Sequence, residues 1–141
     1  MLTTTLSNRH IGFIGVGNMG HGMLKNLVNA GATVNVYDID EGACTRAAEL
    51  GSVIHASPAA VAAAASTVFL CVPAGDEVRE VLFGDVAGKA NSVASTAATG
   101  TLIFDHTTYN RSEAVAFAQR VACAMPIRQF LACCSVLRTA H

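Results

Sequence analysis

Residues 11–20 have the sequence IGFIGVGNMG, and this stretch decides the fold. Its first six residues are an apolar run with the length and composition of a β-strand. Gly15, Gly17 and Gly20 then match the pattern G-x-G-x-x-G, and residues 18–30 carry apolar side chains at helical spacing. A strand that passes through such a turn into a helix is typical of a domain that binds a dinucleotide.

Each glycine has its own expected role. We expect Gly15 to form the tight turn, Gly17 to let the backbone approach a pyrophosphate, and Gly20 to let the helix pack close to the strand. The start of the helix supplies free N–H groups and a positive dipole end. The candidate cofactor-binding residues of this segment are Gly15, Val16, Gly17, Asn18, Met19 and Gly20.

An acidic residue at the end of the second predicted strand, residues 33–37, completes the pattern. Asp38 lies 18 residues after Gly20, near the separation of about 20 expected for the acid that binds the adenosine ribose. Its carboxylate would repel a 2′-phosphate, and the next residue is Ile39 rather than Arg, so the sequence favours NAD over NADP. A Gly-rich turn in a cofactor-free domain is the structural alternative.

Strands and helices alternate along the rest of the chain. We expect helices over residues 41–50, 76–83 and 112–123 and one that starts at residue 58, with Ser57 and Ser112 as N-caps. We expect strands over 52–55, 67–72 and 101–104, and a loop with a weak helix over 84–100. The strands are near-continuous apolar runs, which are typical of parallel sheets covered on both faces. The sequence therefore predicts an α/β fold with a Rossmann-type doubly wound, mostly parallel sheet.

Composition limits the class of protein. The 141 residues correspond to one domain, at about 100 to 200 residues per domain. Hydrophobic residues make up 52% and charged residues 13%, and the net charge of −1 gives no nucleic-acid footprint. Residues 50–75 carry no charge, but the helix start at Ser57-Pro58 and the strand over 67–72 explain them better than a membrane span.

The five cysteines give no sign of a disulfide framework or a metal site. Their number is odd, and none shares zinc spacing with another Cys or a His. Cys71 lies in an apolar run, and we expect it to pack as a small core residue. Without a clear targeting signal, this cysteine usage indicates a reducing compartment, the cytoplasm or the mitochondrial matrix.

The chain resembles the N-terminal half of the 3-hydroxyisobutyrate dehydrogenase family, β-hydroxyacid dehydrogenases related to 6-phosphogluconate dehydrogenase. The resemblance covers residues 11–121 and is carried by the motifs IGFIGVGNMG (11–20), NL (26–27), AG (30–31), VYD (36–38), SP (57–58), VFLCVP (68–73), VLFG (81–84) and DHTT (105–108). It implies NAD(P)-dependent oxidation of a small 3-hydroxy acid to the semialdehyde, or the reverse reduction.

The same resemblance implies further site residues. Val72 and Pro73 would place backbone against the cofactor, Thr108 would contact the nicotinamide end, and Thr107 would lie near the substrate. Loops at the carboxyl ends of parallel strands are where such sheets bind ligands. From the residues alone, DHTT (105–108) is equally explained as a polar strand-end turn with a helix cap.

The family pattern stops after residue 121. In the family, a Gly-rich substrate loop and a helix with the catalytic lysine follow, and neither motif is present. Lys25 and Lys89 do not occupy that motif, so no catalytic residue is assigned. His106 is the one titratable group near the expected site, either structural or a proton-transfer group.

We expect a disordered lead-in over residues 1–10, the dinucleotide-binding domain over 11–123, and an atypical tail over 124–141 outside the family fold. The tail has no acid and no Lys, and a frameshift or alternative splicing would explain it. Residues 129–137 could mimic the missing strand. A sheet that is incomplete at its C-terminal end would leave an unpaired edge and apolar surface open to self-association.

Three functions follow from this pattern. The first is the NAD(P)-binding portion of an oxidoreductase, which binds cofactor but does not turn over unless another domain completes the site for a small 3-hydroxy acid. The second is a non-catalytic, regulatory NAD-binding module. The third is a truncated product without function.

Overall fold

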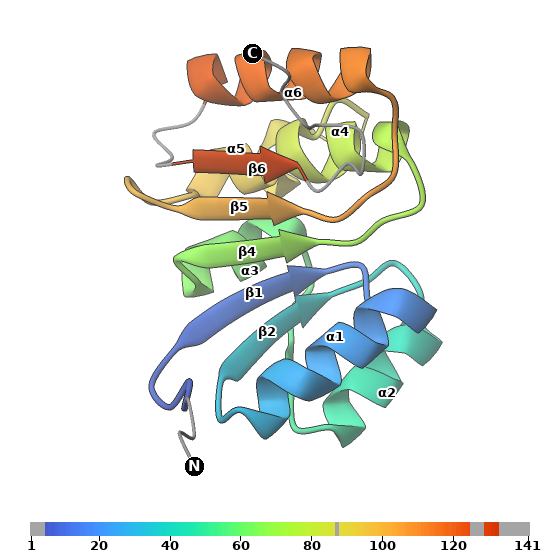
Figure 1. The fold of residues 1–141 in the computed structure, drawn as a ribbon, viewed down its shortest axis with the longest axis vertical. Helices are drawn as coiled ribbons and strands as arrows, with labels where there is room; N and C mark the ends of the chain where they lie inside the picture. Colours follow the sequence, from blue (N-terminus) through green and yellow to red (C-terminus); the bar gives the residue numbers. More distant parts are fainter. Residues whose placement is uncertain (1–4, 87, 125–128, 133–141) are drawn as a thin grey trace.

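The structure is a computed structural model that describes residues 5–86 and 88–124 and the backbone of residues 129–132. Within these ranges, parallel strands form one six-stranded sheet in the order β3-β2-β1-β4-β5-β6 (Figure 1). The strands are β1 (His10–Ile14), β2 (Thr33–Tyr37), β3 (Val53–Ile54), β4 (Thr67–Leu70), β5 (Leu102–Asp105) and β6 (Gln129–Ala132). The strand order reverses next to β1, which confirms the predicted doubly wound sheet.

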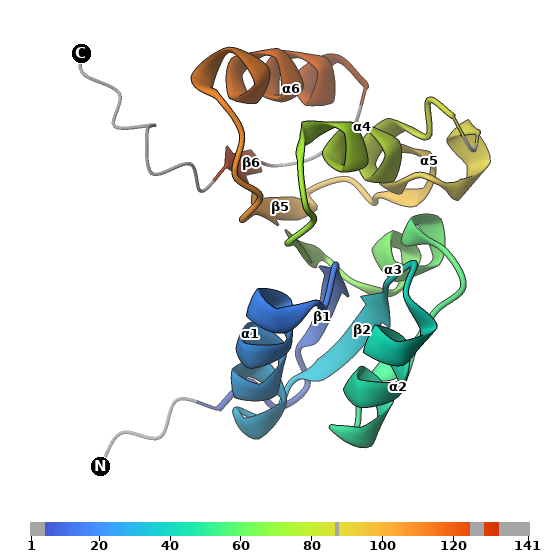
Figure 2. The same cartoon turned by 90° about the vertical axis from the view of Figure 1, so that its right-hand side faces the viewer.

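Helices lie on both faces of the sheet. They are α1 (Asn18–Asn29), α2 (Glu41–Glu49), α3 (Pro58–Ala64), α4 (Gly75–Phe83), α5 (Val93–Thr96) and α6 (Arg111–Ala124), with a 3-10 turn, η1 (Lys89–Asn91), before α5. One core cluster joins α1 and α2 to β1 and β2, and a second joins α3 to α6 with β4 and β5. Figure 2 looks from the side toward which the strands point, with α1 on one side of the sheet and α3, α4 and α5 on the other. No helix in the described ranges is long and apolar enough to cross a membrane.

Of the two predicted helix N-caps, one is confirmed and the other is wrong. The Ser57 hydroxyl accepts a hydrogen bond from the Ala60 N–H at 3.1 Å, which confirms the N-cap of α3. By contrast, α6 begins at Arg111 and is capped by Asn110 instead of Ser112. The Asn110 side chain accepts from the Glu113 N–H at 2.9 Å, and the Glu113 carboxylate accepts from the Asn110 N–H at 3.2 Å. This reciprocal pair is a capping box, and it decides where the helix starts.

Two strands end earlier than predicted because their backbones turn toward other partners. β1 ends at Ile14, and Val16 belongs to the following turn. β4 ends at Leu70, although the Cys71 N–H still donates to the Ile14 carbonyl at 2.9 Å. The next N–H, that of Val72, donates to a side chain instead, the Thr107 hydroxyl.

The sheet continues beyond residue 123, where the domain was expected to end. Gln129–Ala132 form β6, which pairs in parallel with β5 from Leu102 opposite Gln129 onward. This confirms the strand predicted within residues 129–137 for its first four residues, while residues 133–137 lie outside the described part. β5 is therefore not an open edge. At the other terminus, the Leu6 N–H donates to the Ala30 carbonyl at 2.7 Å, so the described part of the lead-in is bonded to the domain.

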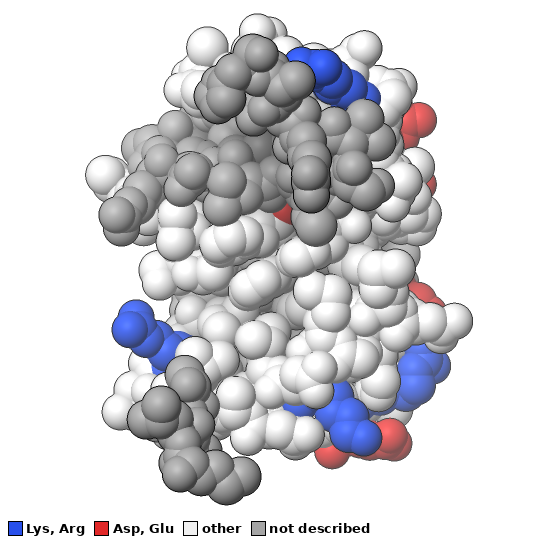
Figure 3. Space-filling view, in the orientation of Figure 1, with Lys and Arg blue, Asp and Glu red and all other residues white. Residues whose placement is uncertain are grey.

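One face of β4 and β5 is only partly covered. Phe69 and Phe104 are half-buried, whereas the neighbouring Leu70 and Ile103, which point to the other face, are 0% exposed. The Phe69 ring stacks between Phe13 and Phe104, at centroid distances of 5.8 and 5.3 Å. Figure 3 shows that the surface over β1 and β4 carries no charged side chain. Among the described residues, this apolar face of the sheet is thus less covered than the opposite face.

Candidate functional site

A cavity of about 850 Å³ opens at the carboxyl ends of the strands. This is the edge where doubly wound sheets bind ligands, beside the point at which the strand order reverses. The first group of lining residues comes from the turn after β1, namely Gly15, Gly17, Asn18, Met19 and Gly20. The second comes from the ends of β2, β4 and β5, namely Tyr37, Asp38, Ile39, Asp40, Cys71, Val72, Pro73, His106 and Thr108.

The turn after β1, residues 15–20, is the glycine turn, and its geometry requires glycine at two positions. Gly15 has a φ of +90°, and a Cβ there would overlap the Cys71 carbonyl oxygen. A Cβ on Gly20 would overlap the Gly15 carbonyl oxygen. The roles expected of Gly15 in the turn and of Gly20 in close helix packing are thereby confirmed.

Gly17 differs from the other two glycines of the turn. A Cβ on Gly17 would meet no atom within 4 Å, so the described residues leave open space beside this backbone. Gly17 precedes α1, whose first turn carries no acid and receives no side-chain cap. A helix N-terminus without a cap presents N–H groups and the positive end of its dipole. The glycine turn therefore fits a pyrophosphate, because that group needs both room and N–H donors.

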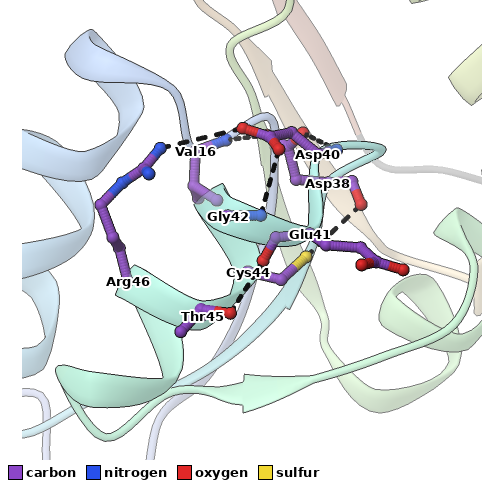
Figure 4. Close-up of polar contacts among 8 residues, drawn as sticks. All are labelled: Val16, Asp38, Asp40, Glu41, Gly42, Cys44, Thr45 and Arg46. Atoms are coloured by element: carbon purple, nitrogen blue, oxygen red, sulfur yellow. Dashed lines mark hydrogen bonds and ion pairs between the residues drawn. The ribbon is translucent and has the colours of Figure 1, made fainter.

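Asp38 lies next to the glycine turn and is held by two backbone N–H groups, one of which belongs to that turn (Figure 4). Its Oδ2 accepts from Val16 and its Oδ1 from Asp40, both at 2.8 Å. A carboxylate offers about four lone-pair sites, so capacity remains for the two hydroxyls of a ribose. Val16 itself does not line the cavity: its side chain is 0% exposed, and its N–H group orients Asp38.

Asp40 caps the next helix, α2, beside Asp38. Its Oδ1 accepts from the Gly42 N–H at 3.0 Å, and its Oδ2 lies 3.9 Å from the Arg46 guanidinium (Figure 4). Asp40 also lines the cavity. The helices α1 and α2 both begin at this edge but differ, because α2 has an acidic cap and α1 has none.

Cys71 follows β4 and is only half-buried. It packs against the core cluster of β1 and β2, as expected of a small core residue, but it also lines the cavity. Burial raises the pKa of the Cys71 thiol, and the nearby Asp105 carboxylate raises it further. The thiol is therefore protonated at neutral pH and is a poor nucleophile. Val72 and Pro73, predicted to lie against the cofactor, line the same wall.

Residues 105–109, at the end of β5, are called the β5 turn. The two threonines predicted as site residues lie in different places in this turn, because only Thr108 lines the cavity. Thr108 is exposed and lines the cavity. Thr107 is 1% exposed, and its hydroxyl accepts from the Val72 N–H at 3.2 Å. Its backbone N–H donates to the Asp105 carboxylate at 2.9 Å. The structure places Thr107 behind the cavity wall, where it links β4 to β5, instead of in the cavity where a substrate would contact it.

His106 lines the cavity together with Cys71 and Thr108. Its ring stacks on Phe69 at a centroid distance of 5.7 Å. The buried Nε2 has no hydrogen-bond partner among the described residues. The structure thus brings His106 to the site, and stacking on an aromatic ring fixes its position.

The sequence patterns did not identify three of the acidic residues at the cavity. Asp40, Glu77 and Glu80 line it together with Asp38, and the described lining contains no Lys or Arg. Glu77 and Glu80 are spaced three apart on α4, so they share a helix face, and this was the available signal. Neither Lys25 nor Lys89 is a lining residue. Within the described ranges, no group of three or more His, Cys, Asp or Glu residues could hold a metal ion.

Comparison with known proteins gives the same picture. The family model for the NAD binding domain of 6-phosphogluconate dehydrogenase matches residues 10–130. Mitochondrial 3-hydroxyisobutyrate dehydrogenase of Mus musculus is 33% identical over 115 residues, which are 82% of this chain and 33% of that protein. The 3-sulfolactaldehyde reductase of Escherichia coli K12 is 36% identical over 98 residues, 70% of this chain and 31% of the reductase. The chain spans about a third of the length of these relatives.

Solved structures agree with the fold. Mycobacterium tuberculosis 3-hydroxyisobutyrate dehydrogenase with L-serine matches at a TM-score of 0.74 and 29% identity, over 88% of this chain and 38% of that one. An imine reductase from Myxococcus stipitatus in complex with NAD+ matches at a TM-score of 0.76 and 18% identity, over 89% and 40%, which supports the fold alone. The chain belongs to the family of NAD-binding domains of the 6-phosphogluconate dehydrogenase type, among relatives that include 3-hydroxyisobutyrate dehydrogenases.

Proposed function

We propose that this chain binds NAD in the cavity at the carboxyl ends of its strands, as the cofactor portion of an oxidoreductase. One observation carries the proposal: the open space at Gly17 lies beside an uncapped helix start, and the Asp38 carboxylate, which is bonded to the Val16 N–H of the same turn, lines the same cavity. The pyrophosphate would bind at the start of α1, and the adenosine ribose would donate its hydroxyls to Asp38. Val72, Pro73 and Thr108 would line the nicotinamide end.

Charge favours NAD over NADP. A 2′-phosphate next to Asp38 would also lie in a cavity lined by Asp40, Glu77 and Glu80, and like charges at short range repel. Ile39, which follows Asp38, is 90% exposed and offers no positive charge to a phosphate. The Arg46 guanidinium is held near Asp40. We therefore expect NADH to bind more tightly than NADPH, by about tenfold or more.

The reaction that this portion would serve is hydride transfer between NAD and a small 3-hydroxy acid. NAD would supply the hydride acceptor, and the residues of this chain would bind and orient it. Support comes from the similarity to 3-hydroxyisobutyrate dehydrogenases, of which this chain matches 33% and 38% of the length. Because no lysine lines the described cavity, we expect cofactor binding without turnover by this chain alone. A non-catalytic NAD-binding module is the second candidate, and the same observation favours it.

The test is a titration of the purified chain with NADH and NADPH by calorimetry, since the chain has no Trp to report binding. Assays with NAD and either 3-hydroxyisobutyrate or L-serine then follow. We expect NADH binding, weaker NADPH binding and no measurable turnover. Tight NADPH binding would contradict the NAD preference, and robust turnover would contradict the non-catalytic expectation. If the chain bound neither nucleotide, the third possibility, a truncated product without function, would be favoured.

A matched pair of variants locates the binding. Asp38→Ala removes the carboxylate that faces the ribose, and we expect it to weaken NADH binding by about tenfold. Asp85→Asn removes an exposed carboxylate that pairs with Arg120 away from the cavity, and we expect NADH binding to be unchanged. Equal effects of the two variants would place the nucleotide elsewhere.

A further inference from the structure

Asp105 is a buried carboxylate at the start of the β5 turn, outside the glycine turn. It ends β5 and is 0% exposed. Its Oδ1 accepts from the Thr107 N–H at 2.9 Å, and its Oδ2 accepts from the Tyr109 hydroxyl at 2.5 Å. Both donors belong to the β5 turn, so the carboxylate folds this turn back onto the end of its own strand.

The same group is linked to the neighbouring strand. The Thr107 hydroxyl accepts from the Val72 N–H, and the His106 N–H donates to the Leu70 carbonyl at 2.8 Å. Leu70 is the register partner of Asp105 in the sheet. A continuous chain of hydrogen bonds therefore runs from Tyr109 through Asp105 and Thr107 to the backbone after β4.

The wall of the cavity is built on this chain. Val72, His106 and Thr108 line the cavity, whereas Asp105 and Thr107 lie directly behind them. Tyr109 anchors the far end, because its ring packs edge-on against Phe117 of α6 at 5.2 Å. A shift of the β5 turn would move the residues that we assign to the nicotinamide end.

We propose that Asp105 is a positioning residue for the cofactor site: it holds the β5 turn and the Val72 backbone in the arrangement that receives the nicotinamide end. The inference rests on the proposed function, since it concerns the same site. The ligand of the site is the dinucleotide, and Val72 and Thr108, not Asp105, would contact its nicotinamide end.

The electrostatics of Asp105 give the proposal a pH-dependent readout. Burial raises the pKa of Asp105, although hydrogen bonds from Tyr109 and Thr107 and the nearby His106 act in the opposite direction. The charged carboxylate is thus less favourable in the folded chain than in the unfolded one. The ionised form of Asp105 lowers the stability of the fold. The free energy of unfolding therefore falls as pH rises from the unfolded pKa through the raised folded pKa. The titratable groups that interact with Asp105 are Tyr109 and His106 from the β5 turn and Cys71 from the end of β4.

Asp105→Asn is the decisive variant. We expect NADH affinity to fall by about tenfold at neutral pH, because the amide keeps the shape but has one acceptor oxygen instead of two, so one of the two hydrogen bonds that set the turn is lost. The thermal midpoint should be equal to or above that of the unsubstituted chain, because the buried charge is gone. Unchanged NADH affinity would overturn the proposal. Parallel losses of stability and affinity would also overturn it, since they indicate a structural role only.

Tyr109→Phe tests the proposal from the other side. The ring and its contact with Phe117 remain, but one hydrogen bond to the carboxylate is lost, so the pKa of Asp105 should rise further. NADH affinity of the unsubstituted chain should weaken as pH falls through the pKa of Asp105, and Tyr109→Phe should shift this dependence to higher pH. Asp105→Asn should abolish it. An identical pH profile in all three proteins would refute the assignment.

Asp85→Asn serves as the matched control for a lost aspartate, and it should bind NADH normally. If the unsubstituted chain binds no NADH, the proposed function fails and this inference falls with it. If the chain binds NADH and Asp105→Asn binds it equally well, only the inference fails.

Discussion

The glycine turn and the β5 turn form two walls of the same cavity by opposite means. In the glycine turn, side chains are missing where the backbone must pass close to other atoms, and space is open at Gly17. In the β5 turn, the Asp105 carboxylate accepts from the Thr107 N–H and the Tyr109 hydroxyl, and the Thr107 hydroxyl accepts from the Val72 N–H. The first wall exposes backbone to a ligand, and the second uses buried polar groups to fix where its backbone lies.

The difference teaches how much each turn tolerates change. The shape of the glycine turn is set by steric contacts. A substitution at Gly15 should therefore cause a large loss in the free energy of unfolding, whereas one at Gly17 should weaken only NADH binding. The β5 turn is set by hydrogen bonds, each of which contributes about 0.5–1.5 kcal/mol. Its substitutions should therefore act in graded steps.

Gly15→Ala should have the largest effect. The new Cβ would overlap the Cys71 carbonyl oxygen in a backbone with φ of +90°, so both strain and overpacking apply. We expect a loss of about 3 kcal/mol or more in the free energy of unfolding, measured by chemical denaturation. Gly51→Ala is the matched control, because Gly51 has a φ of +95° but open space around its Cβ position. It should lose only about 1 kcal/mol, and equal losses would show that sterics do not define the glycine turn.

Gly17→Ala should separate binding from stability. Its Cβ would enter open space, so we expect the free energy of unfolding to change by less than about 1 kcal/mol. The methyl group would occupy the place of the pyrophosphate, and NADH affinity should fall by about tenfold or more. Calorimetric titration beside a denaturation curve checks both numbers. Normal NADH binding by this variant would show that the pyrophosphate does not bind at the glycine turn.

Thr107→Val should give the graded effect expected of the β5 turn. The side chain keeps its shape but leaves the Val72 N–H without its acceptor, at an expected cost of about 1–2 kcal/mol in unfolding free energy. Thr45→Val is the control, because the Thr45 hydroxyl donates to the Glu41 carbonyl in an exposed position. It should change the stability by less than about 0.5 kcal/mol. A loss as large as that of Gly15→Ala would erase the contrast between the two turns.

The smallest effect concerns Asp85, which lies outside both turns. Hydrogen bonds from Arg120 lower the pKa of Asp85 below its ordinary value, so this pair stabilises the fold above the unfolded pKa. That contribution is lost as pH falls through the lowered folded pKa. Asp85→Asn should therefore flatten the acid side of a stability curve against pH slightly, whereas Asp105→Asn should change the slope in the opposite sense. Thermal unfolding measured across the acid pH range gives the change in slope for each variant. Changes of the same sign would contradict the opposite pKa shifts of Asp85 and Asp105.

The two turns also differ in how far they could be predicted. The strand, the turn and the helix around residues 11–30 follow from local patterns, because glycine positions and apolar spacing report backbone geometry directly. Asp38 could be found because its distance along the chain is fixed by one strand and one helix. The role of Thr107 could not, since it depends on a bond to Val72, 35 residues away in sequence. Ser112 failed as a cap because Asn110 and Glu113 form a reciprocal pair that competes for the same helix start.

The acidic lining of the cavity has a consequence for kinetics. A dinucleotide brings two negative phosphates toward Asp38, Asp40, Glu77 and Glu80, and no lysine or arginine belongs to the described lining. Long-range repulsion should therefore slow the encounter, while the short-range donors at the start of α1 hold the ligand once it has arrived. Salt screens charges beyond a Debye length of about 10 Å at 0.1 M, so the association rate should rise with ionic strength. Binding to this cavity would therefore depend on contacts that the dinucleotide makes only at close range.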